Sequence, residues 1–457
     1  MSSSDLAVSS FGAGEAAPTL LEAPPRQLGF RDQVVLWWNL GVTLTIPVAA
    51  AFVLQPFPGL PPLSLGAAVA AIALGAVLGS MVLGWAAVPG ADTGAPAMVV
   101  LRGLLGRRGS WIPSALNVAQ CVGWAAVEIL IIGNGAARIF PGVPRAAFLV
   151  AAGVAATALA VRPLGFIREL RKYAVWLVLA ASAYLFLQVL RRGIVPPPGG
   201  AWTQFWPAVD LVVALPISWA PLAADYARHS RTPKKAFGGA AAGFGLAAIA
   251  YFLLGVFAVT AIPGAAKDPI GALLSVQVGA IAVAVLVLDE LDEAFANLYS
   301  TALSAQNVRP RVDRRTAVIA VGAVATLLAL AMDVTQYESF LFLIGSVFVP
   351  LFAVLLVDYF VLGRRRGWNV GPDAPGRPLM AVPWALGFVA YQLLNPGTVP
   401  GWSDAWRAVQ AALGFTPPLW ASASIGAFLV AAAATLVVGP LDRRRAAAGE
   451  GAASTRR

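Results

Sequence analysis

Histidine, cysteine and charged residues are scarce in this sequence. A single cysteine, Cys121, excludes an internal disulfide and any metal site built from several cysteines. A single histidine, His229, excludes most histidine-based catalysis and metal binding. Only 12% of the 457 residues are charged, about half the share that is typical of a soluble globular domain. The composition therefore argues against a soluble enzyme.

Apolar residues take the place of the missing charge. They make up 59% of the chain, and the mean hydropathy is +0.76. A helix crosses the hydrocarbon core of a membrane with about 20 apolar residues, and runs of this kind recur between Pro, Gly and charged residues. We predict an all-α polytopic membrane protein in a lipid bilayer, with twelve transmembrane helices. The predicted segments are 34–54, 64–88, 111–136, 146–161, 173–190, 206–227, 236–262, 275–303, 315–332, 337–363, 379–395 and 417–440.

The basic residues lie mostly on one side of the predicted membrane. If the N-terminus is cytoplasmic, all but six of the 32 Lys and Arg fall in cytoplasmic segments. This asymmetry follows the positive-inside rule, so the net charge of +10 reflects topology and not a nucleic-acid partner. Both termini are expected in the cytoplasm. The six exceptions are Arg138, Arg145, Arg191, Arg192, Lys267 and Arg407.

Two stretches at the ends of the chain are predicted to lie outside the membrane. Residues 1–30 are rich in Ser, Ala and Pro, and they lack both a basic start and a continuous apolar segment. These features predict a disordered cytoplasmic tail, not a cleaved signal peptide. Residues 442–457 are predicted to form a second cytoplasmic tail.

The first and sixth predicted helices carry helix breakers at depth. Gly41 and Pro47 lie in the first, and Pro216 and Pro221 lie in the sixth. Proline removes a backbone N–H and clashes with the preceding turn, so the freed polar groups must face protein or a wet cavity. Either break alone is compatible with an ordinary proline kink. Two breaks five helices apart favour an inverted repeat of five plus five helices, in which substrate and ion bind where the helices unwind.

The third predicted helix places a row of polar and aromatic residues on one face. Gln120, Trp124 and Glu128 recur at intervals of four and therefore share that face. Trp124 offers a stacking surface for a planar ring, and Glu128 can accept a hydrogen bond or, when protonated, donate one. Packing against the core or lipid is the alternative for Trp124. An ionisable group at membrane depth costs ~2.5–3.5 kcal/mol on insertion scales, which makes Glu128 a functional candidate.

The eighth predicted helix contains four carboxylates directly behind an apolar run. These are Asp289, Glu290, Asp292 and Glu293, and Asn297 follows on the same stripe as Asp289 and Glu293. Four acids so close together cannot all be ionised in a low dielectric, so either some are protonated or a cation is bound. The alternative is a surface cluster at a helix end. The apolar run that precedes the acids favours the buried arrangement.

From about Gly29 to Leu441 the sequence resembles the nucleobase:cation symporter-1 family. Within that family it is most similar to the bacterial branch of cytosine permeases and hydroxymethylpyrimidine (thiamine-precursor) transporters. The resemblance rests on four stretches taken together, since none is specific alone. They are GADTGAPAMVVLRGLLGRRGSWIPSALNVAQCVGWAAVEI, ISWAPLAADYARHSRTPKKAF, FANLYSTALSAQN and YESFLFLIGSVFVPLFAVLLVDYFVLGRRR.

The resemblance implies a secondary active transporter that works by alternating access. Its fold would be a ten-helix inverted-repeat core of the leucine-transporter type over residues 31–363, with two additional transmembrane helices over 379–441. It would import a small planar heterocycle such as cytosine or hydroxymethylpyrimidine, together with Na⁺ or H⁺ as the coupling ion and without another cofactor. A functional monomer in the bacterial cytoplasmic membrane is expected.

The resemblance also implies which residues bind the substrate. Trp124 falls where the family stacks its ring, Glu128 where relatives often carry a Gln, and Asn297 where an amide contacts the ligand. Gln120 and Thr45 complete this part of the expected site.

On the sixth helix the sequence departs from the family pattern. The second aromatic residue of the family aligns with Pro216, so Trp219 is expected to supply the missing ring and Ser218 a polar contact. For the cation, relatives that use sodium combine carbonyls of the first helix, here about Gly41 and Leu44, with hydroxyls of the eighth. This sequence has Leu291 and Asp292 at the hydroxyl positions, with Glu293 next, so the predicted cation site is Gly41, Leu44, Asp292 and Glu293.

A channel and a metal-dependent membrane enzyme that uses the carboxylates of the eighth helix are the alternative functions. The enzyme lacks His or Cys ligands and a phosphate-binding loop. A channel filter is usually built from symmetric or repeated charged rings, whereas these acids lie on one helix of one chain.

Overall fold

The computed structural model describes residues 19–20, 23–57, 59–165, 173–332, 337–418 and 420–454, and the side chains of 337–339, 341 and 445–454 are not described. Most of the predicted disordered tail therefore lies outside the described residues. Within them the chain is helical, and its extended pairing consists of two isolated bridges, Leu28 with Ser230 and Leu63 with Ala201. The all-α prediction is confirmed.

The helices of the first half are α1 (Phe30–Asn39), α2 (Thr45–Leu54), α3 (Leu65–Thr93), α4 (Ala97–Val100), α5 (Arg102–Gly109), α6 (Trp111–Ile139), α7 (Arg145–Val161), α9 (Val175–Arg191), α10 (Phe205–Ser218) and α11 (Ala220–Ala227). Those of the second half are α12 (Pro233–Ala261), α13 (Pro269–Leu274), α14 (Gly279–Val308), α15 (Arg314–Ala331), α16 (Tyr337–Leu356), α17 (Ala381–Leu394), α18 (Trp402–Ala412) and α19 (Ala423–Ser454). The last of these continues through most of the predicted C-terminal tail.

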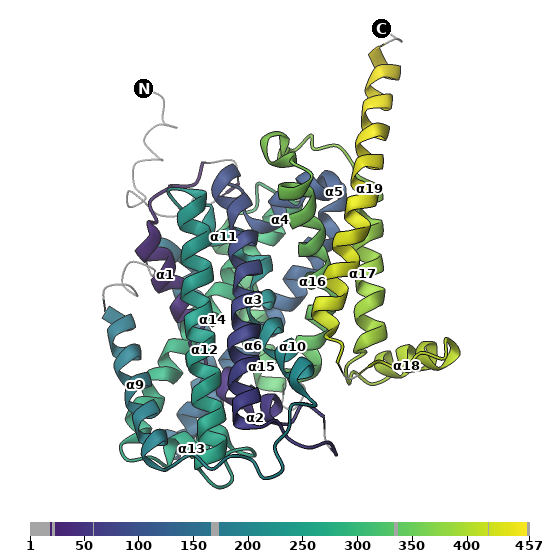
Figure 1. Ribbon diagram of the computed structural model, residues 1–457. Helices are drawn as coiled ribbons and strands as arrows, with labels where there is room; N and C mark the ends of the chain where they lie inside the picture. Colours follow the sequence, from purple (N-terminus) through teal and green to yellow (C-terminus); the bar gives the residue numbers. More distant parts are fainter. Residues whose placement is uncertain are drawn as a thin grey trace, which may run out of the picture.

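The long helices stand roughly side by side in one bundle, as expected for a protein that crosses a membrane (Figure 1). Seven of the described helices are long and apolar enough to span a bilayer, and four shorter apolar helices accompany them. Large apolar side chains also point outward, for example Val154, Trp176 and Leu327, each more than 60% exposed. Such a surface suits lipid and not water. A helix or pair of helices lies in each predicted segment, and the number that crosses the membrane stays a prediction.

The first predicted span is broken between α1 and α2. Residues 40–44 leave the helix, and the N–H groups of Gly41 and Val42 turn back to the carbonyls of Trp38 and Asn39. Pro47 lies in the first turn of α2, where no intrahelical N–H is needed, so it follows the break without disrupting α2. The predicted discontinuity is confirmed.

The sixth predicted span is interrupted more tightly. Helix α10 ends at Ser218 and α11 begins at Ala220, so Trp219 alone separates them. Pro216 lies inside α10, and Pro221 lies in the first turn of α11. The break falls between the two prolines that predicted it.

Glycines allow the broken helices to pack closely against α3 and α12. A Cβ placed on Gly79 of α3 would lie 2.9 Å from the Pro216 ring, and one on Gly90 would lie 2.7 Å from the Ala224 backbone. On α12, a Cβ on Gly243 would lie 2.9 Å from Cβ of Trp37. Small residues of this kind let membrane helices approach without side chains between them.

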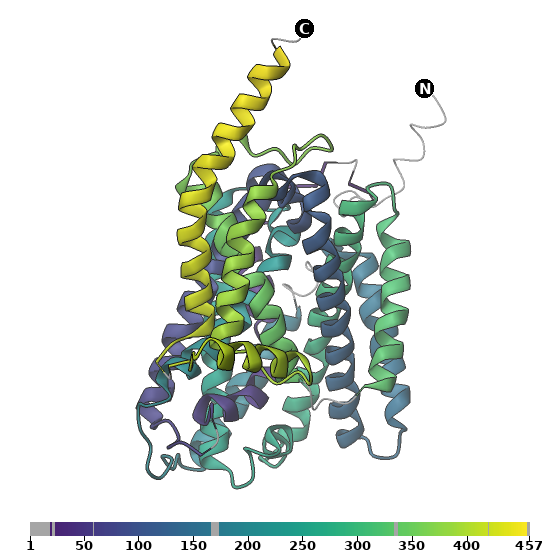
Figure 2. The ribbon, with the colours of Figure 1, turned by 90° about the vertical axis from the view of Figure 1, so that its right-hand side faces the viewer.

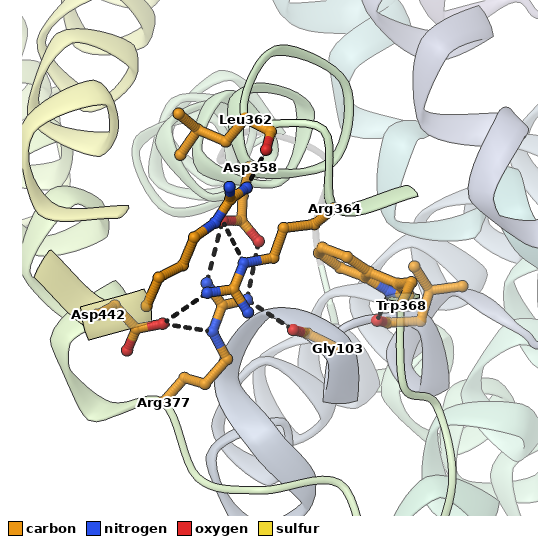
Figure 3. Close-up of polar contacts among 9 residues, drawn as sticks. Gly103, Asp358, Leu362, Arg364, Trp368, Arg377 and Asp442 are labelled. Atoms are coloured by element: carbon orange, nitrogen blue, oxygen red, sulfur yellow. Dashed lines mark hydrogen bonds and ion pairs between the residues drawn. The ribbon is translucent and has the colours of Figure 1, made fainter. Parts of the chain in front are cut away.

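The two additional helices, α17 and α19, stand together at one side of the bundle. Helix α18 extends sideways from the end of this pair that lies opposite the C-terminus (Figures 1 and 2). An ion network joins them to the core. Arg377 donates two hydrogen bonds to Asp358, at 2.8 and 3.0 Å, and one to Asp442 of α19 at 2.7 Å (Figure 3). Burial lowers the pKa of Arg377, but the two aspartates more than offset this and raise it above the ordinary arginine value.

Candidate functional site

A small pocket lies where the two broken helices meet α6 and α14. It is lined by Thr43, Thr45, Trp124, Glu128, Leu215, Ser218, Trp219, Leu222, Glu293 and Asn297. Seven of these residues are among the predicted substrate or cation ligands. The exceptions are Thr43, Leu215 and Leu222, which lie near predicted residues on the same broken helices.

One wall of the pocket combines an indole with a carboxylate. Trp124 and Glu128 lie one turn apart on α6 and are 8% and 2% exposed. The Trp124 ring also contacts Phe340 of α16, with ring centroids 5.4 Å apart and planes inclined by 58°. Glu128 keeps one carboxylate oxygen, Oε2, without a hydrogen-bond partner. This wall therefore offers a flat apolar face and, beside it, a free acceptor.

Another part of the lining comes from the break between α10 and α11. Trp219 stands at the break and meets Trp37 edge to face, with ring centroids 6.4 Å apart. Ser218 lines the pocket, and its hydroxyl donates to the Leu215 carbonyl at 2.6 Å. Pro216 instead packs against Gly79 on α3 and is not part of the described lining.

Gln120 and Asn297 differ in their relation to the pocket. Gln120 lies one turn before Trp124 on α6, where its amide donates to Asn117 at 2.7 Å, and it is outside the described lining. Asn297 lines the pocket, and its amide nitrogen donates to the Glu293 carbonyl at 3.0 Å. That contact leaves the side-chain oxygen of Asn297, Oδ1, as a potential acceptor for a ligand.

The four acids of α14 are all buried, with at most 6% exposure, as the sequence predicts. Two of them hold the unwound segment of the first span. Asp289 accepts from the Asn39 amide at 2.8 Å. Glu290 accepts from the Thr43 hydroxyl at 3.1 Å and from the backbone N–H of Leu44 at 2.5 Å. A carboxylate at this point meets the N-terminal end of α2, where the helix dipole favours negative charge.

Glu290 was not among the predicted site residues, although it contacts one of them. It contacts Leu44, a predicted cation ligand, whereas both carboxylate oxygens of Asp292 are buried without a hydrogen-bond partner. The spacing of Glu290 and Glu293, three residues apart, places both on the face that looks toward α6. That spacing is visible in the sequence, but Asp289 and Asp292 are also three residues apart. Spacing alone therefore could not show which of the two pairs faces α6.

The comparisons with known proteins agree with this architecture. Residues 58–369 match the family described as "Permease for cytosine/purines, uracil, thiamine, allantoin". The match covers more than half of the chain, so the protein belongs to this family and is a membrane transporter, not an enzyme.

Individual relatives are distant. YxlA of Bacillus subtilis (strain 168), named for a purine-cytosine permease, is 25% identical over 348 residues, which are 71% of this chain and 73% of YxlA. The cytosine permease of Escherichia coli (strain K12) is 26% identical over 348 residues, 72% of this chain and 79% of the permease.

Among solved structures, the chain resembles Mhp1, a nucleobase-cation-symport-1 family transporter in a closed conformation with bromovinylhydantoin bound. The TM-score is 0.70 at 18% identity, and the match covers 94% of this chain and 96% of Mhp1. The predicted leucine-transporter-type fold is thereby confirmed.

Proposed function

We propose that this transporter imports a nucleobase or a related pyrimidine, of the cytosine or hydroxymethylpyrimidine type, by cation symport with alternating access. The observation that carries the proposal is the pocket between the two helix breaks, where Trp124 and Glu128 lie side by side. An aromatic face beside an acceptor suits a flat heterocycle that presents N–H groups at its edge. The family description and the names of the relatives support this substrate class.

In this proposal the ring stacks on Trp124, and Trp219 supplies the second aromatic wall. Glu128 and the side-chain oxygen of Asn297 accept hydrogen bonds from the N–H groups at the edge of the ligand, while Thr45 and Ser218 offer hydroxyls. Gln120 and Pro216 support the wall from behind, through Asn117 and Gly79 respectively. Substrate recognition would need no covalent chemistry and no cofactor beyond the coupling ion.

The ion part of the proposal places the cation next to the broken first helix. The residues predicted from the sequence are Gly41, Leu44, Asp292 and Glu293, and the ion is Na⁺ or H⁺. The transporter would act as a monomer in the bacterial inner membrane, with both termini in the cytoplasm. The α1 start and the α19 end lie at the same end of the bundle, which is compatible with that topology (Figure 1).

A thermal-shift screen of the purified protein tests the substrate class. Cytosine, uracil, purines, hydroxymethylpyrimidine and thiamine are each added in sodium and in choline buffer, with proline as a non-aromatic control. We expect saturable stabilisation by at least one planar heterocycle and none by proline. If no planar heterocycle raises the melting temperature in either buffer, the proposed substrate class is wrong.

A further inference from the structure

Three buried glutamates meet between the pocket and the broken first helix. Glu128 comes from α6, and Glu290 and Glu293 come from α14. One carboxylate oxygen from each lies within 4.8 Å of the other two, and none of the three residues is more than 2% exposed. The group joins a predicted substrate ligand, Glu128, to the carboxylate that holds the first helix break.

The described part of the protein offers these three carboxyl groups no cationic partner. Within the described residues, none of the three glutamates forms an ion pair with a Lys, Arg or His. Glu290 is oriented by the hydrogen bonds from Thr43 and Leu44. Glu128 Oε2 and Glu293 Oε1, in contrast, are buried without any hydrogen-bond partner. Leaving buried acceptors unpaired costs about 1–3 kcal/mol each, and more when charged. These two oxygens therefore need either a proton shared with a neighbouring carboxyl group or a bound cation.

We propose that Glu128, Glu290 and Glu293 bind a hard metal cation of the Na⁺ or Ca²⁺ class. Carboxylate oxygens are the ligands such ions prefer. An ion with metal–oxygen distances of about 2.3–2.6 Å holds oxygens on opposite sides about 5 Å apart, which accommodates the observed group. The Thr43 hydroxyl, already bonded to Glu290, lies beside it. The site differs from the cation site predicted from the sequence, because its ligands include Glu128 and Glu290 and do not include Asp292.

Two glutamates belong to both the pocket and the cation group, which gives the site a role in coupling; this step depends on the proposed function. Glu128 and Glu293 line the pocket and also belong to the cation group. A bound cation would fix the Glu128 carboxylate and offset its charge, leaving one oxygen to accept from the heterocycle. The ion and the heterocycle would then raise each other's affinity by the same factor.

Direct cation binding by the purified full-length protein tests the site without any transport measurement. NaCl and CaCl₂ are titrated separately against choline chloride, at constant ionic strength and fixed pH, without a heterocycle. Melting temperature and calorimetric heat are recorded. We expect saturable binding of at least one metal, and a loss of at least tenfold in affinity in each of Glu128→Gln, Glu290→Gln and Glu293→Gln. The matched control Asp289→Asn, whose residue bonds Asn39, should stay within twofold of wild type.

Several outcomes would overturn the site. If neither metal binds saturably to wild-type protein that still binds a heterocycle, the metal site is wrong and the proposed function stands. If metal binding is lost in Asp292→Asn but kept in Glu290→Gln, the assignment to the three glutamates is wrong. The first of these results comes from the wild-type protein alone, so it remains decisive even if a variant fails to fold.

Coupling between the metal and the heterocycle is measured as the change in heterocycle affinity that saturating metal produces. Wild type should gain at least fivefold from the metal, and Glu128→Gln should gain less than twofold. An undiminished gain in Glu128→Gln would refute coupling through this residue. Metal binding in a protein that binds no heterocycle would keep the site and refute the proposed function.

Discussion

Trp124 is the residue on which the proposed substrate class depends most. Its indole is the aromatic face beside Glu128, and stacking of a base on an aromatic side chain contributes about 1–3 kcal/mol. We predict that Trp124→Ala lowers the affinity for the heterocycle by at least tenfold and leaves the protein folded. Calorimetric titration checks the affinity, and Trp124→Phe, which keeps a ring, should recover most of it. Wild-type affinity in Trp124→Ala would reject the stacking role.

His229 lies outside the membrane-spanning segments but is buried, and its position leads to a pH prediction. Burial and the neighbouring Arg228 lower its pKa to about 3, so the folded protein keeps it neutral. The unfolded chain takes up the proton below a pH of about 6.5, so acidification favours unfolding by about 1.4 kcal/mol per pH unit below that value, until the folded pKa is reached.

We therefore predict that the stability contributed by neutral His229 is present above a pH of about 6.5 and is lost progressively as the pH falls. Its ring contacts the Pro25 carbonyl at 3.0 Å and the Tyr299 hydroxyl at 3.4 Å, which His229→Gln can partly replace. The melting temperature should fall less between about pH 7.5 and pH 5 in His229→Gln than in wild type. An equal fall in both proteins would show that His229 does not contribute to acid sensitivity.

At the level of the helices, α11, which follows the break in the sixth span, packs closely against α3. Gly90 of α3 meets the backbone of Ala224, and a methyl group there has no room. We predict that Gly90→Ala destabilises the protein by about 1–3 kcal/mol, the usual effect of overpacking a core. Gly66, also in α3, is the matched control, because a Cβ added there would meet nothing within 4 Å.

Gly66→Ala should leave stability unchanged or raise it slightly, because alanine favours a helix over glycine by about 1 kcal/mol. Melting temperatures of the two variants in the same detergent check the comparison. Equal stability of Gly90→Ala and Gly66→Ala would mean that the close approach of α3 and α11 is not needed.

The helices and their breaks could be predicted from the sequence because apolar runs and prolines act locally. Gly41 and Pro47 predicted the first break, and the prolines at 216 and 221 bracket the second. The side of each helix that faces the pocket was harder to predict. Pro216 was expected at a position that binds the ring. It lies inside α10, before the break at Trp219, and packs on Gly79 of α3 instead of lining the pocket.

Glu290 shows the limit of sequence reasoning more clearly. Its bond to Leu44 joins residues 246 positions apart, and no local pattern specifies such a contact. Four acids in five positions leave the sequence without a preferred face, and only the packing of α14 against α6 selects Glu290 and Glu293 to meet Glu128.

For the whole molecule, the ion network at Arg377 ties the two additional helices to the core (Figure 3). Arg377 and its partners Asp358 and Asp442 are buried. Arg364 also approaches both aspartates, at 3.6 and 3.4 Å, so removing the Arg377 guanidinium leaves two buried carboxylates with a single arginine partner among the described residues. Breaking a buried ion pair in this way costs about 3–5 kcal/mol. We predict that Arg377→Met sharply reduces the yield of folded protein in fluorescence-detected size-exclusion chromatography.

The control for this network is Arg407→Met, because Arg407 pairs with Asp404 on an exposed helix and should contribute little. Adding Asp442→Asn to Arg377→Met should restore part of the yield, since Arg364 then faces one carboxylate, Asp358, instead of two. Normal yield in Arg377→Met alone would show that α17 and α19 do not need the network.

The most direct test of coupled transport is uptake of a labelled heterocycle, identified in the thermal-shift screen, into proteoliposomes with an inward cation gradient. We predict uptake that saturates with concentration, accumulates the heterocycle above its external level, and collapses when an ionophore removes the gradient. Trp124→Ala should abolish it. Uptake that rises linearly with concentration and stops at equal concentrations on both sides would instead indicate a channel and contradict the account.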